Sequence, residues 1–174
     1  LARSVGSVQA EADCALVFGA LATERGQLDD AGEAYDRALQ RAREMKNRRA
    51  EAEALAGHGR VYLAMGDLDA ARAAFDQSRQ IAEPMGARRV LADALAGTAR
   101  ALELQDASDQ AREAFQRALT LAEDMGQARL IAEAAAGLGR CRRRAGDRQG
   151  ALDLFVKAIQ VAKRSAATCG PFAA

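Results

Sequence analysis

The sequence contains no tryptophan and only two prolines, and aromatic residues make up 4% of its 174 positions. Alanine supplies about a quarter of the chain instead, with 44 residues. Because alanine is the best helix former and proline the worst, this composition predicts an all-α protein. The hydrophobic share of 49% is too high for a disordered chain, so we expect a folded one.

An excess of charge of one sign is absent as well. Lysine and arginine number 25 against 24 aspartates and glutamates, which leaves a formal net charge of +1. We therefore expect no nucleic-acid partner, since the chain has neither a basic field nor a series of aromatic stacking platforms. The longest apolar run, 15–22, is far shorter than the roughly 18 residues of a membrane span, so we expect no membrane insertion.

The three cysteines, Cys14, Cys141 and Cys169, are odd in number and form no CxxC pair. This usage argues against a disulfide framework and favours a reducing, cytoplasmic compartment. No hydrophobic leader opens the sequence, and its first residue is not methionine. We expect the native N-terminus to lie elsewhere and the sequence to be a fragment of a larger protein.

An internal repeat of 40 residues dominates the sequence. Residues 54–93 and 94–133 align without a gap and share 16 of 40 positions. An aromatic residue recurs at the same spacing, at Tyr35, Phe75, Phe115 and Phe155. A fixed period of this length is the signature of a solenoid, in which each unit buries its apolar face against its neighbours.

Each unit divides into two predicted helices. Gly26, Gly66 and Gly146 stand where a first helix would end, because glycine accepts the positive φ of a helix C-terminus. Acidic residues such as Asp67 and Asp147 follow, as the start of the next helix prefers. Two short turns leave two helices of about 17 residues each, each about 25 Å long.

The motif within the unit resembles the tetratricopeptide repeat. Leu55-x2-His58-Gly59-x2-Tyr62 followed by Ala71-x3-Phe75 is similar to the family signature without its tryptophan. The 40-residue period resembles the long-helix arrays of Pins/LGN-type scaffolds, kinesin light chains and maltose-activator-like regulators. The resemblance implies a right-handed α-solenoid of stacked helix-turn-helix units that recognises a protein or peptide without catalysis.

The predicted organisation follows the repeat frame. Four units occupy the segments 14–53, 54–93, 94–133 and 134–164. Residues 1–13 align with the end of a second helix, so we expect a remnant of a preceding repeat there. Residues 165–174 are expected to form a C-terminal tail, because the pattern fails after Arg164 and the segment contains glycine and proline. The open N-terminal half-repeat also offers an apolar face for self-association.

The resemblance implies that the first helices line a concave groove. Their outward positions hold a periodic row of arginines, Arg60, Arg100 and Arg140, which Arg143 and Arg144 extend. The acids Asp13, Glu53, Asp93 and Glu133 alternate with them. Arginine binds carboxylates by bidentate hydrogen bonds, so one hypothesis is an acidic peptide in the groove. The other is that each arginine pairs with an acid on a neighbouring first helix and ties the units together.

Glycines recur within the first helices, at Gly57, Gly97 and Gly137. A glycine in a helix costs about 1 kcal/mol relative to alanine, so a physical reason is required. They either let adjacent first helices approach closely or form a groove floor that a ligand backbone can reach.

Catalytic, metal-binding and cofactor motifs are missing. The single histidine, His58, occupies a core-type position and has no nucleophile motif around it. The scattered cysteines form no metal-ligand cluster, and no phosphate-binding glycine loop occurs. We therefore predict a non-catalytic scaffold or adaptor that binds a protein or peptide, with no cofactor and no metal. The alternative is a sensor or autoinhibitory segment of a larger signalling protein or transcription regulator.

Overall fold

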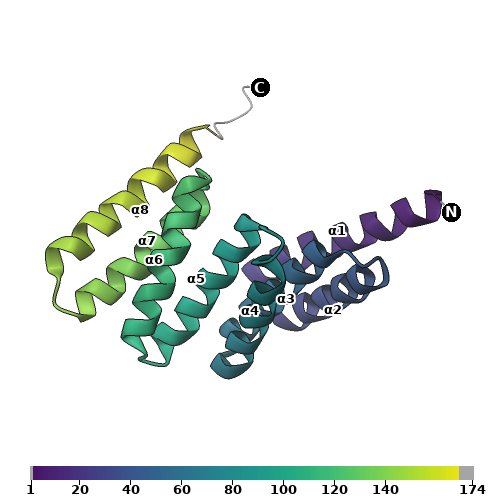
Figure 1. Ribbon diagram of the computed structural model, residues 1–174, viewed down its shortest axis with the longest axis horizontal. Coiled ribbons are helices and arrows are strands. Elements are labelled where there is room, and N and C mark those ends of the chain that lie inside the picture. Colours follow the sequence, from purple (N-terminus) through teal and green to yellow (C-terminus); the bar gives the residue numbers. More distant parts are fainter. Residues whose placement is uncertain (1, 169–174) are drawn as a thin grey trace.

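The computed structural model describes residues 2–168, and these residues form eight α-helices and no strand (Figure 1). In chain order they are α1 (Ala2–Glu24), α2 (Leu28–Glu44), α3 (Arg48–Met65), α4 (Leu68–Ala82), α5 (Arg88–Leu104), α6 (Ser108–Asp124), α7 (Ala128–Arg144) and α8 (Arg148–Thr168). The internal helices have 15 to 18 residues, close to the predicted length.

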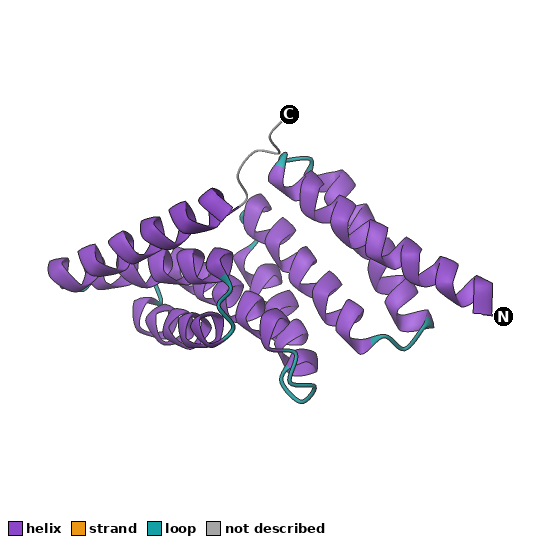
Figure 2. Cartoon of the chain, turned by 90° about the horizontal axis from the view of Figure 1, so that it is seen from above, coloured by secondary structure: helices purple, strands orange, loops and turns teal. Residues whose placement is uncertain are grey.

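The helices pack in consecutive pairs, and each pair packs on the next. The first helices also touch one another, α1 with α3, α3 with α5 and α5 with α7, whereas the second helices make no such contact in the described part. The stack therefore bends around its first helices, and α1 and α8 lie at its two ends (Figures 1 and 2). The predicted α-solenoid of four helix-turn-helix units is confirmed.

The turns follow the predicted backbone chemistry. Gly26, Gly66 and Gly146 have φ of +75°, +83° and +85°, as a helix C-terminus requires. The Asp67 carboxylate then caps α4 by accepting a hydrogen bond of 3.0 Å from the Ala70 amide. In the third unit Asp106 occupies the equivalent turn position. It has a φ of +59°, although it is not a glycine.

The helix boundaries differ in phase from the predicted repeat frame. First helices begin at Arg48, Arg88 and Ala128, so the frame starting at 54, 94 and 134 opens six residues inside them. At the N-terminus α1 runs through Gly6 without a turn, and the expected remnant forms one helix with the first unit. At the other end α8 continues to Thr168, because Gly170 and Pro171 come only later; the rest of the expected tail lies outside the described residues.

The predicted aromatic series anchors the core. Tyr35, Phe75 and Phe115 are at most 1% exposed, each between the helices of its own unit and the first helix of the next. Phe155 in α8 is only half-buried, since no further unit lies against it in the described part.

Candidate functional site

The first-helix groove is the concave surface formed by α1, α3, α5 and α7, and it carries the predicted row of arginines and acids. The Arg60 guanidinium in α3 reaches across to α5, where its Nη1 lies 2.5 Å from Oδ2 of Asp93. Its Nη2 donates to the Tyr35 hydroxyl at 3.4 Å, and the guanidinium lies 6.0 Å from the centre of that ring. Burial alone would lower the pKa of Arg60, but the Asp93 carboxylate and the Tyr35 oxygen outweigh it and raise the pKa.

A buried carboxylate, Glu103, organises the next contact. Arg140 in α7 makes a bidentate pair with it at 2.7 and 2.9 Å, and Arg100 donates from the same helix at 2.7 Å. The Glu103 side chain is 2% exposed, and burial would raise its pKa, but the hydrogen bonds from both arginines outweigh burial and lower it. Glu103 was not among the predicted groove residues; its one sequence signal is an acid at the position of Leu63.

The predicted acids take part in further pairs between first helices. Glu53 accepts from Arg89 of α5 at 2.6 Å and from Arg49 of its own helix at 3.2 Å. Arg129 of α7 lies 3.4 Å from Asp93 and 3.2 Å from Glu133. Burial and the neighbouring Asp93 raise the pKa of Glu133. Arg129 lowers this pKa, but by less than burial and Asp93 together raise it.

The arginine row is thus paired with acids, mostly on neighbouring first helices. At the C-terminal end of the groove the pairing weakens. The Nη1 of Arg144 donates to the Glu103 carbonyl at 3.0 Å and lies 3.5 Å from Asp106, with its side chain 46% exposed. Arg143 is exposed, and its side chain makes no hydrogen bond or ion pair with the described residues. A first-helix arginine without an acidic partner therefore lies at this end.

The glycines predicted as a groove floor lie elsewhere. Gly57, Gly97 and Gly137 are buried, and each faces the aromatic ring of the preceding unit's second helix. A Cβ built at any of them would approach that ring to well under 3.0 Å, a separation that real Cβ atoms essentially never show. Each of these glycines admits the aromatic ring of the preceding unit, a contact that the sequence analysis did not predict. That partner is 22 residues away in sequence, which single-helix patterns do not reveal.

One hollow opens within the groove, above α3 and between α1 and α5. Its volume is about 180 Å³. The apolar side consists of Leu16, Val17, Ala20 and Val90, and the polar side of the pairs Arg60–Asp93 and Arg89–Glu53, with Tyr35 also lining it. A more polar hollow of about 270 Å³ adjoins it and shares Leu16, Glu53 and Arg89. Sequence analysis did not predict either hollow.

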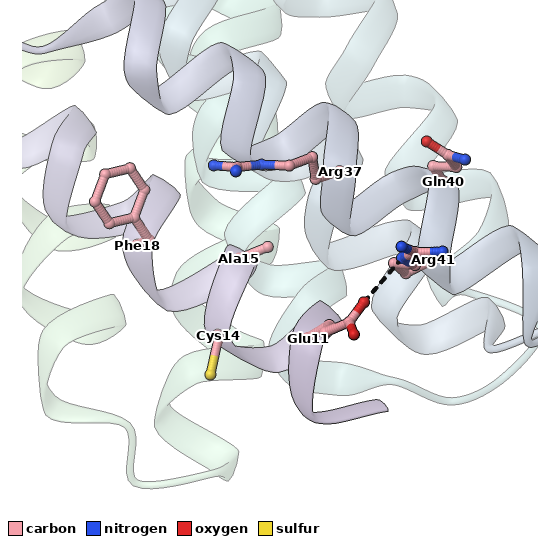
Figure 3. A pocket seen from close by; sticks show the side chains of 7 residues that line it. All are labelled: Glu11, Cys14, Ala15, Phe18, Arg37, Gln40 and Arg41. Atoms are coloured by element: carbon pink, nitrogen blue, oxygen red, sulfur yellow. Dashed lines mark ion pairs between the residues drawn. The ribbon is translucent and has the colours of Figure 1, made fainter. Parts of the chain in front are cut away.

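A larger pocket, of about 380 Å³, lies on the outer side of the first pair (Figure 3). Cys14, Ala15 and Phe18 of α1 line it opposite Arg37 and Gln40 of α2. Figure 3 also shows the Glu11–Arg41 ion pair of 3.1 Å at its edge. In the second unit the corresponding surface, Leu55 and Ile81, is covered by Leu39 of the preceding pair. The pocket therefore lies at the N-terminal end of the described stack.

His58 belongs to the interface between the first two units. Its Nε2 lies 3.1 Å from Oδ1 of Asp36 in α2, and its ring stacks on Tyr62 at a centroid distance of 6.1 Å. Burial lowers the pKa of His58, and Asp36 offsets only part of that effect. Among the described residues, no group of three histidine, cysteine or acidic side chains could hold a metal ion. None of the described helices is both long enough and apolar enough to span a membrane.

These features define an α-solenoid whose stacked helix pairs present a polar concave surface. Residues 11–84 match the family model of the tetratricopeptide repeat. This segment carries tetratricopeptide repeats, a family whose members are in general protein–protein interaction modules. A comparison with curated proteins gives no match.

Several solved structures have a similar fold. RapI in its apo form is 15% identical, with a TM-score of 0.76 over 89% of this chain and 57% of RapI. Aspartyl phosphate phosphatase F from Bacillus subtilis is 18% identical, with a TM-score of 0.70 over 93% of this chain and 43% of the phosphatase. BtubC from P. vanneervenii is 17% identical, with a TM-score of 0.70 over 93% of this chain and 73% of BtubC. The chain thus spans little more than half the length of RapI.

Proposed function

We propose that the protein is a non-catalytic scaffold or adaptor that binds a peptide or protein segment in its first-helix groove. The observation that carries this proposal is the groove itself: four first helices lie in a row, charged side chains line them, and a hollow opens between α1 and α5. Extended concave surfaces of this kind are what solenoid proteins use for binding.

The segment bound at the C-terminal end of the groove is acidic. Arg143 is exposed and unpaired within the described residues, and Arg144 is 46% exposed. Arg60 and Arg140 are already paired with Asp93 and Glu103, so they contribute less free charge. An acidic side chain or C-terminus would pair with the Arg143 guanidinium and with the donors of Arg144 that do not bond Glu103 or Asp106.

The experiment is a pull-down from cell lysate with the chain as bait, beside an Arg143→Glu/Arg144→Glu variant. The matched control is Arg112→Glu/Arg117→Glu, which makes the same charge change at exposed arginines of α6, a second helix. Circular dichroism first establishes that all three baits are folded. A partner retained by the control and lost by the groove variant supports the proposal. A partner retained by the groove variant but lost by the control contradicts it and places binding on the outer helices.

A second candidate is a sensor or autoinhibitory segment of a larger signalling protein or transcription regulator. RapI and phosphatase F favour it, because in both the comparable array is part of a longer chain. The natural reading frame distinguishes the two. A nucleotide-binding or DNA-binding domain in the same chain supports the sensor, and an uninterrupted series of further repeats supports the scaffold.

Self-association through the open N-terminal end is a further part of the proposal. Phe18 and Leu21 are 49% and 48% exposed on the side of α1 that internal units bury against a preceding pair. An apolar face of this kind is typical of a two-fold contact between copies. Light scattering over a concentration series tests it with Phe18→Glu: a dimer that this variant abolishes supports self-association, and a monomer at all concentrations contradicts it.

A further inference from the structure

We infer that the hollow between α1 and α5 is an anchor pocket for one apolar side chain of the bound segment. The inference rests on the proposed binding role of the first-helix groove and specifies what binds at its N-terminal end. It concerns the hollow of about 180 Å³ and not the pocket on the outer side of the first pair.

Two residues make the first unit different from the others. Ala20 stands 40 residues before Arg60 and therefore occupies the repeat position that holds an arginine in later units. Because alanine is much smaller than arginine, the space that an arginine side chain would fill is part of the hollow. Val17 occupies the position at which later units have glycine, and it presents a side chain to the hollow. Val17 is 60% exposed, the largest value among the exposed large hydrophobic residues of the described chain. Part of this apolar surface lines the hollow, and the rest lies on the side of α1 that in later units meets the preceding unit's aromatic ring.

The opposite wall is polar but already neutralised. Arg60 is paired with Asp93 at 2.5 Å, and Arg89 with Glu53 at 2.6 Å, so both cations that line the hollow already have a carboxylate partner. A charged side chain would gain little Coulomb energy there and would lose hydration. An aliphatic or aromatic side chain would instead remove the exposed surface of Val17 from water, which is favourable.

The size of the hollow fits a side chain better than a whole ligand. Pockets for small-molecule ligands usually measure about 300–1,000 Å³, and this one measures about 180 Å³. The adjoining hollow of about 270 Å³ continues along Leu16 and Glu53 and leaves room for the next residues of an extended segment. The Tyr35 hydroxyl at the base of the hollow accepts a hydrogen bond from Arg60.

The test is selection of a random-peptide phage library on the full chain, followed by fluorescence anisotropy with the selected peptide. We expect leucine, isoleucine, valine, methionine or phenylalanine at one shared position. Alanine at that position should weaken binding about ten- to hundredfold. Ala20→Arg fills the hollow with the side chain that other units carry, and Val17→Asp removes its apolar wall; both should weaken binding similarly. The matched control is Val156→Asp, which changes an exposed valine of α8, a second helix.

The outcomes separate this inference from the broader proposal. Peptides without a shared apolar position, or an affinity that Ala20→Arg leaves unchanged, overturn the anchor pocket. If such peptides are acidic and lose binding in the Arg143→Glu/Arg144→Glu variant, the groove proposal stands by itself. A library that yields no binder on the folded chain overturns both.

Discussion

The ring of Phe75 in α4 lies against Gly97 in α5, where a Cβ on the glycine would collide with the ring. The same ring also faces Gly59 of its own unit, where a built Cβ would stand 2.7 Å from it. Each interior aromatic residue thus joins two units, and the glycine on the following helix sets how closely they approach.

Gly97→Ala should destabilise the protein by about 1–3 kcal/mol, because the fully buried ring of Phe75 has no room to move. The better helix propensity of alanine offsets only part of this cost. Gly32→Ala is the control, since Gly32 is helical and has open space around its Cβ position. That change should stabilise by about 1 kcal/mol. Urea denaturation measures both, and equal effects would contradict the packing argument.

Glu103→Gln should cost about 2 kcal/mol, because it leaves Arg140 and Arg100 without their shared charge. The estimate is below that for a fully buried pair, since both arginines are partly exposed and screened by water. Thermal unfolding of the variant beside Glu113→Gln on α6 checks the value. A variant as stable as the unmodified chain would mean that the pair contributes nothing net.

Lys46→Gly should stabilise the protein by about 1 kcal/mol. Lys46 has φ of +53°, in a turn where Gly86 and Gly126 occupy the equivalent positions. A non-glycine residue in this left-handed region costs roughly 1–2 kcal/mol, which glycine avoids. Glycine loses more conformational entropy on folding, and this loss offsets part of the stabilisation. The reciprocal change Gly86→Lys should destabilise by a similar amount. A lower melting temperature for Lys46→Gly would show that the turn is not strained.

Stability should fall as the pH drops from 7 to 5, because burial lowers the pKa of His58, the single histidine, below its ordinary value of 6.5. The unfolded chain then binds the proton more readily than the folded one. The contribution of neutral His58 to the free energy of unfolding is fully present above the pKa of this residue in the unfolded chain. It is lost as the pH falls towards its lower pKa in the folded protein. His58→Leu, which copies Leu138 of the fourth unit, should remove this dependence. Urea midpoints across this range measure it, and an unchanged slope in the variant would rule out His58 as the cause.

The periodic residues predicted much of the architecture. The 40-residue spacing of Tyr35 and Phe75, together with the turn glycine Gly66, was enough to predict paired helices in a solenoid. The turn signal is local in sequence, and the aromatic signal repeats at a fixed spacing. The residue at which each unit begins was harder to predict. Ala54 starts a repeated sequence motif, but it lies six residues after the start of α3.

The candidate site depended more on three dimensions. The alternation of arginines and acids along the first helices could be predicted from the sequence alone, because both recur with the unit. The packing of the helices was needed to show that Arg140 pairs with Glu103, that Gly97 admits the ring of Phe75, and that a hollow opens beside Val17. Each of these depends on which side chains of different helices meet, and that is set by the distance and angle between helices rather than by any pattern within one.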